Sequence, residues 1–178
     1  MAAPHNKKRY GEQWPQWRIE ALAELEPIKP WVIFSGGWAW HFMSPQGHDE
    51  LKHAHDHKDF DVFVPPEKVA IVLVVLNENG FATVPTRYGP GKDDFRRYEK
   101  LIDVGDTQKR VTIDLFVREV SFRQHKDGWL YVEPEYLLTL YSDIHSSDNC
   151  FAVVAAKKLI DKGIDPEGRK ELVEIPSE

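Results

Sequence analysis

Hydrophobic residues recur with two different periods along the chain, and each period predicts a different element. From Glu12 to Leu25 the large apolar side chains are spaced near the period of an α-helix. Residues 31–34 form an apolar run that ends at Ser35-Gly36-Gly37, which predicts a buried strand followed by a tight turn. A helix is expected from Trp38 to Met43, and residues 44–58 are polar and histidine-rich, as in a loop.

Two later segments, residues 59–64 and 110–117, alternate between two faces, and Phe63 and Phe116 are the apolar residues that share the parity of the aspartates. Such alternation is typical of a strand that turns one face toward a core. In both segments the positions of one parity are aromatic or aliphatic. The other parity carries the aspartates, which are Asp59, Asp61 and Asp114.

The remaining segments complete the predicted order of elements. Pro65-Pro66-Glu67 begins a helix that ends at Asn79-Gly80. A turn-forming cluster at residues 89–94 separates two further strands. These strands cover residues 81–87 and 95–101; a short strand at 129–132 and helices at 133–141 and 147–162 follow.

This order of elements predicts an α+β, or mixed α/β, fold: a mixed β-sheet flanked by helices, with a helical C-terminal part. We expect a single domain over residues 1–178. Within it, residues 1–28 would be an N-terminal helical segment, 29–125 the core and 126–178 the C-terminal helical region.

Composition narrows the class of protein. Because 42% of the residues are hydrophobic, the chain can bury a core, yet no apolar run approaches the roughly 18 residues of a membrane span. The basic N-terminus has no apolar segment after it, and Cys150 is the only cysteine, so we expect a cytoplasmic protein without membrane contact. The net charge of −6 favours a small substrate, or a short piece of nucleic acid, over duplex binding.

The aspartates are the most informative residues. Asp59 and Asp61 are two apart on one strand, so they share a face with side chains roughly 5–7 Å apart. Like charges at this distance repel one another, and a divalent cation with oxygen ligands, such as Mg²⁺, would remove the repulsion. If the strand of Asp114 lies alongside, the three carboxylates can hold two Mg²⁺ ions for phosphoryl or nucleotidyl transfer.

A glycine pair lies at another strand end. Ser35-Gly36-Gly37 comes between a predicted strand and a predicted helix. Glycine lets a backbone approach a phosphate closely, and the helix N-terminus favours its negative charge. The same pair also suits an ordinary turn.

These motifs together resemble the nucleotidyltransferase superfamily of DNA polymerase β, and most of all its minimal antibiotic-modifying and toxin-like members. The resemblance rests on Gly36-Gly37-Trp38-Ala39 and on the run from His57 to Val64, which contains Asp59-x-Asp61. These members include the lincosamide and aminoglycoside nucleotidyltransferases. The lincosamide-modifying branch in particular has a Gly-Gly-Trp opening and a His two residues before the first Asp, which are present here as Gly36-Gly37-Trp38 and His57. The resemblance covers about residues 31 to 117. The insert from His48 to His57 makes the connection between Gly37 and Asp59 longer than is usual in this branch.

The resemblance implies a nucleotidyltransferase that moves a nucleoside monophosphate from a triphosphate, such as ATP, onto an acceptor hydroxyl and releases pyrophosphate. Asp59, Asp61 and Asp114 would bind two Mg²⁺ ions, or Mn²⁺, and Asp114 is a candidate base. Ser35, Gly36 and Gly37 would contact the β- and γ-phosphates. The acceptor stays open between a small molecule, the 3′ end of tRNA and a protein side chain; the preferred nucleotide and the oligomeric state are open too.

The histidine-rich loop allows other interpretations. His53, His55 and His57 would share a face with the aspartates if the chain is extended there, which would suit a transition metal. A solvated polar loop is the alternative for the first two, whereas His57 lies beside the cluster and is a further candidate metal ligand. His55-Asp56 also resembles the doublet of the all-helical HD phosphohydrolases, but an alternating strand follows it.

Two alternative functions therefore remain beside the transferase. One is a non-catalytic nucleotide-binding module of the same fold, and the other is a His/Asp metal-dependent phosphohydrolase. A basic stretch, which either contacts a triphosphate or a nucleic-acid backbone or simply faces solvent, does not discriminate between them. It comprises Lys92, Arg96, Arg97 and Lys100.

Overall fold

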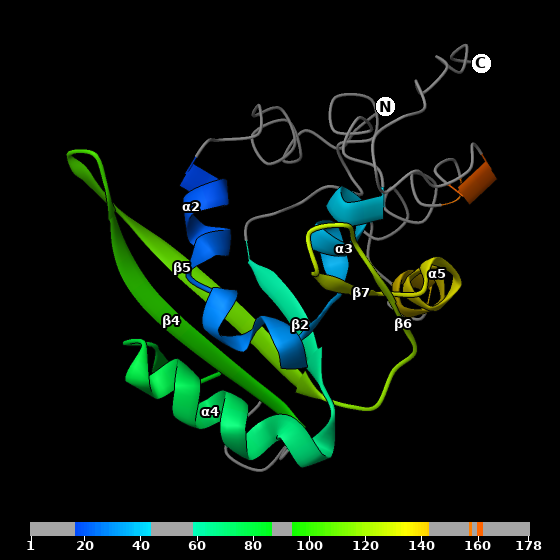
Figure 1. Cartoon of the computed structure of the whole chain (residues 1–178), viewed down its shortest axis with the longest axis horizontal. Coiled ribbons are helices and arrows are strands. Elements are labelled where there is room, and N and C mark those ends of the chain that lie inside the picture. Colours follow the sequence, from blue (N-terminus) through cyan, green and yellow to red (C-terminus); the bar gives the residue numbers. More distant parts are fainter. Residues whose placement is uncertain (1–16, 44–58, 87–93, 143–156, 158–159, 162–178) are drawn as a thin grey trace.

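A mixed sheet organises the computed structural model, which describes residues 17–43, 59–86, 94–142, 157 and 160–161. In this part of the chain the sheet has seven strands in the order β3-β4-β5-β2-β1-β7-β6 (Figure 1). The strands are β1 (Ile33–Phe34), β2 (Phe60–Val64), β3 (Ala82–Val84), β4 (Phe95–Val104), β5 (Thr107–Val117), β6 (Phe122–Gln124) and β7 (Leu130–Val132).

Helices flank this sheet. They are α2 (Trp17–Ala23), α3 (Gly36–Met43), α4 (Val69–Glu78) and α5 (Pro134–Ser142), with short 3-10 helices η1 (Glu26–Trp31) and η4 (Pro66–Lys68). Figure 1 shows α2, η1 and α4 lying across one side of β4, β5 and β2. On that side Lys100 of β4 forms an ion pair with Glu24, just after α2. The predicted mixed sheet flanked by helices is therefore confirmed.

The pairing of the strands brings distant segments together. β2 runs parallel to β5 and antiparallel to β1, and β1 runs parallel to β7. β4 and β5 form a long antiparallel hairpin that turns at Gly105, whose φ of 59° suits glycine. β2 and β5 thus become neighbours although η4, α4, β3 and β4 lie between them in sequence.

One face of the central strands is closed by the core. Side chains of one parity on β2 and β5 have 0–2% of their surface exposed, and α3 adds Trp38, whose ring stacks on Phe60 at 4.7 Å between centroids. This burial satisfies the hydrophobic positions of both alternating segments. The buried residues of this parity are Phe60, Val62, Val64, Val111, Ile113 and Leu115.

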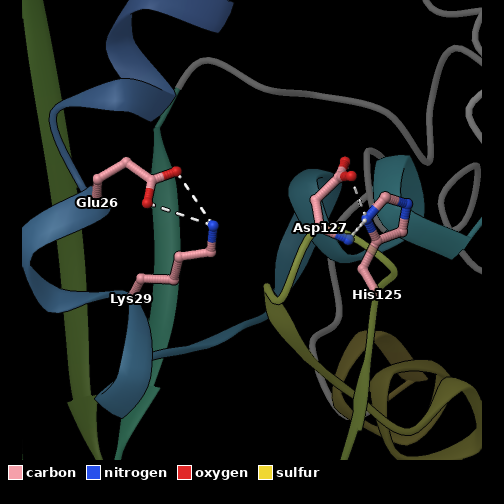
Figure 2. A network of polar contacts seen from close by, with 4 residues as sticks. All are labelled: Glu26, Lys29, His125 and Asp127. Atoms are coloured by element: carbon pink, nitrogen blue, oxygen red, sulfur yellow. Dashed lines mark hydrogen bonds and ion pairs between the residues drawn. The ribbon is translucent and has the colours of Figure 1, made fainter.

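The β6–β7 turn packs against η1 through Lys29. The Lys29 ammonium lies 4.5 Å from the centre of the Trp129 ring and 3.2 Å from Glu26. In the turn itself, the imidazole of His125 faces the Asp127 carboxylate at 3.3 Å (Figure 2). These contacts fix the edge of the sheet that lies away from β4.

Several predicted boundaries were wrong. Residues up to Trp31 form η1, with Pro27 in its first turn, so the first strand covers only Ile33–Phe34. β5 begins at Thr107 and not at Arg110, because the hairpin tip is exposed on both faces and its sequence loses the alternation. β6 was not predicted at all.

Other predictions agree with the structure or lie outside it. The helix after Pro65 is present as η4 and α4, the strand pair β3–β4 is antiparallel, and α5 follows β7. The predicted loop at 44–58 and most of the helix at 147–162 fall outside the described residues. Over the part of the chain that is described, no helix has the length and apolarity needed to cross a membrane.

Candidate active site on the carboxylate face

The second face of β4, β5 and β2 carries Arg97, Asp114 and Asp61, and we call it the carboxylate face. Asp61 of β2 is the register partner of Asp114 of β5, and Asp114 is the register partner of Arg97 of β4. Neighbouring strands lie about 4.8 Å apart, and register partners point to the same side. The two aspartates predicted from separate segments are thus side by side.

A row of aromatic rings borders these charges. The next same-face positions along the three strands are Phe63, Phe116 and Phe95. The ring centroids of Phe95 and Phe116 are 4.9 Å apart, and those of Phe116 and Phe63 are 5.7 Å apart. Beyond them, Tyr136 of α5 packs on Phe63 at 6.1 Å. α5 therefore contacts the aromatic row at Phe63.

Arg97 holds the third aspartate by two parallel hydrogen bonds. Its Nε donates to Oδ1 of Asp114 at 2.6 Å, and its Nη2 donates to Oδ2 at 2.7 Å. These bonds raise the pKa of the guanidinium above its ordinary value, and the charges of Asp114, Asp59 and Glu99 add to the rise. With Asp114 only 8% exposed, this fork fixes the orientation of its carboxylate.

The glycine turn contacts Asp61 directly. The Ser35 N–H donates to the Asp61 carbonyl at 2.8 Å, and Gly36 opens α3 with a φ of 59°. A Cβ on Gly36 would lie 2.3 Å from Oδ2 of Asp61. Only a residue without a side chain fits at this position, so the predicted phosphate turn and the predicted metal ligand form one site.

A pocket of about 360 Å³ extends from this site along the aromatic row. Ser35, Gly36 and Asp61 line one end. Asp94 and Arg118 line it as well, and Arg118 donates to the Tyr136 hydroxyl at 3.1 Å. The apolar walls come from Phe63, Phe116, Val117, Leu137 and Leu140.

The donor chemistry of the face suits a hard cation such as Mg²⁺. Carboxylate oxygens are its preferred ligands, and each Asp114 oxygen keeps a lone pair beside its bond to Arg97. Asp59 directly precedes β2 and acts electrostatically on Arg97, so its charge lies near the pair. Among the described residues no group of three His, Cys, Asp or Glu side chains is arranged to hold a metal ion. Metal binding stays a prediction.

The other residues of the sequence motifs lie elsewhere. Gly37 is buried in the first turn of α3, and Trp38 belongs to the core, at 1% exposure. The candidate ligand His57, the rest of the histidine insert, Lys92 and Cys150 lie outside the described residues.

Sequence reasoning missed the role of Arg97 and the pocket. The sequence places Arg97 in a basic stretch, whereas its side chain binds Asp114. The parity of β4 carries a signal for this, because Phe95 and Arg97 repeat the aromatic–charged order of Phe116 and Asp114. Asp94 and Arg118 carry no motif and meet only through the fold.

Comparison with known proteins gives a likeness in fold. JHP933 from Helicobacter pylori matches 79% of this chain and 66% of its own length, with a TM-score of 0.54 and 10% identity. A "putative nucleotidyltransferase from H. pylori" matches 72% of this chain and 59% of its own length, with a TM-score of 0.46 and 11% identity. This chain thus spans less than two thirds of either structure. No protein-family model and no curated protein sequence matches it.

Proposed function

We propose that this protein is a metal-dependent nucleotidyltransferase. The observation that supports it best is the register of Asp61 with Asp114 beside Gly36. Two carboxylates at neighbouring strand positions repel each other, and a fold gains no packing energy from them. A divalent cation bound between these carboxylates and a triphosphate would remove their repulsion and would explain why both are present.

Each residue then has a role in the transfer. The backbone at Ser35, Gly36 and Gly37 contacts the β- and γ-phosphates, at a helix N-terminus that favours negative charge. Asp59, Asp61 and Asp114 hold Mg²⁺, with His57 as a further candidate ligand. When bound, Mg²⁺ neutralises charge on the phosphates and on the attacking and leaving oxygens.

The reaction forms one phosphorus–oxygen bond and breaks another. The acceptor hydroxyl oxygen attacks the α-phosphorus, the bond to the β-phosphate oxygen breaks, and pyrophosphate leaves. Asp114 accepts the hydroxyl proton. The acceptor class is a hydroxyl on a small molecule, an RNA 3′ end or a protein, and we place the reaction in the cytoplasm.

Incubation of the protein with each labelled triphosphate, Mg²⁺ and a panel of acceptors tests this function. The panel includes tRNA and the protein itself. Asp61→Asn and Asp114→Asn are expected to reduce label transfer on the order of a thousandfold while the fold is kept. Asp106→Asn, at the exposed tip of the β4–β5 hairpin, is the matched control and should transfer normally. Full activity in both site variants would reject the proposal.

One observation favours a second candidate, a nucleotide-binding module without turnover. Arg97 engages both oxygens of Asp114, the ligand that would also serve as the base. In such a module the guanidinium takes the place of a cation permanently. Both candidates bind a triphosphate, so pyrophosphate release separates them: its absence with every acceptor, despite binding, would select the module.

A further inference from the structure

The pocket beside Asp61 has a size and a lining that suit a ring. Its volume of about 360 Å³ is at the lower end of the range for small-molecule sites. Phe116 and Phe63 of the sheet and Leu137 and Leu140 of α5 line it. Aromatic and aliphatic side chains together offer stacking and dry contact to a planar group.

The polar groups of the pocket can orient a ring by hydrogen bonds. The Asp94 carboxylate only accepts hydrogen bonds, whereas the Arg118 guanidinium only donates them. Arg118 uses one N–H group on the Tyr136 hydroxyl and has other donors left. A ring that presents an amino group next to an acceptor atom matches this pair.

The pocket is continuous with the carboxylate face, and this indicates which kind of molecule contains the ring. Ser35, Gly36 and Asp61 line the pocket and also belong to the proposed triphosphate site. A single ligand can therefore place its phosphates at the glycine turn and its ring between β5 and α5. Nucleoside triphosphates are ligands of this shape.

We propose that the pocket binds the nucleobase of the triphosphate and prefers bases with an amino group over uracil. This proposal rests on the proposed function, because it assumes a triphosphate at Gly36 and Asp61. Phe116 provides the stacking surface, and Asp94 accepts from the amino group. Uracil presents a carbonyl oxygen in place of the amino group of cytosine, and that oxygen would face the Asp94 carboxylate without a proton between them.

Binding measurements on the full chain with Mg²⁺ test this assignment, with ATP, CTP, UTP and inorganic triphosphate as ligands. Stacking on an aromatic side chain should make ATP and CTP bind about tenfold more tightly than inorganic triphosphate. CTP should bind more tightly than UTP. In Asp94→Asn the difference between CTP and UTP should shrink, while binding of inorganic triphosphate is kept.

A pair of tryptophan variants on α5 locates the ring. Leu140→Trp fills the pocket and should reduce the affinity for ATP to that for inorganic triphosphate. Thr139→Trp places the same bulk on the exposed side of the same helix and should bind like the parent protein. If Leu140→Trp does not fold, the CTP-to-UTP ratio of Asp94→Asn still decides.

The outcomes separate the two proposals. If nucleotides and inorganic triphosphate bind equally and Leu140→Trp changes nothing, the nucleobase assignment is wrong and the proposed function stands. If Leu140→Trp keeps nucleotide affinity but loses transfer, the pocket serves the acceptor, which also overturns the assignment. If neither nucleotide nor inorganic triphosphate binds, the proposed function fails and the assignment fails with it.

Discussion

Strands β2 and β5 have two faces with opposite properties. On one face Val62, Ile113 and Leu115 are fully buried in the core. On the other face, at the adjacent positions of the same strands, Asp61 and Asp114 lie beside each other. The contrast shows that alternation lets one backbone serve packing and charge at once, because neighbouring side chains point to opposite sides.

The two faces also differ in what they contribute to stability. Burial of the core face stabilises the fold by roughly 1.5–3 kcal/mol for each large apolar side chain. The carboxylate face opposes folding through like charges, and Arg97 offsets part of this by its bonds to Asp114. Substitutions on the two faces should therefore affect different properties.

The largest effect on stability is expected for a pair of neighbours on β5. Ile113→Ala should lower the free energy of unfolding by about 2–5 kcal/mol, because it empties a fully buried position. Asp114→Asn should lower it by only about 1–2 kcal/mol, since the amide keeps one acceptor for Arg97. Denaturant unfolding measures both values. Equal losses of unfolding free energy in the two variants would show that the carboxylate face contributes as much to stability as the core face does.

The contact between Gly36 and Asp61 gives a second test, with a matched control. Gly36 and Gly105 have the same φ of 59°, so alanine strains the backbone equally at both, by roughly 1–2 kcal/mol. Only at Gly36 would the new methyl group collide with Asp61; at Gly105 nothing lies within 4 Å. Gly36→Ala should therefore melt at a lower temperature than Gly105→Ala and alone lose triphosphate binding. Identical behaviour of the two variants would contradict the contact.

The smallest effect on stability is expected for Arg97. Arg97→Met should lower the free energy of unfolding by about 1 kcal/mol, because the pair is partly exposed. It should also raise the affinity for Mg²⁺ roughly tenfold, since a positive charge leaves the carboxylates. Arg96→Met, the neighbour on the opposite face, should leave Mg²⁺ affinity unchanged in titration calorimetry. A lower affinity in Arg97→Met would mean that Arg97 mainly orients Asp114.

Local patterns predicted the elements of the site, and tertiary pairing decided the rest. The alternation around Asp61 and Asp114 identified both strands and the face that carries the aspartates. The same reasoning failed at the β4–β5 hairpin, because an exposed tip has no buried face to impose a period. It also could not find Asp94 or Arg118, because neither lies in a motif. The β4–β5 pairing brings Asp94 beside Val117, and residues of β2 and α5 complete the pocket that Asp94 and Arg118 line.

The β4–β5 hairpin also bears on the order in which the charges meet during folding. Arg97 and Asp114 are 17 residues apart and face each other across one local turn. The pairing of β2 with β5 closes a much longer loop, which costs more chain entropy and forms more slowly. The guanidinium can thus reach Asp114 before Asp61 arrives, so the repelling carboxylates come together only after one of them already has a counter-ion.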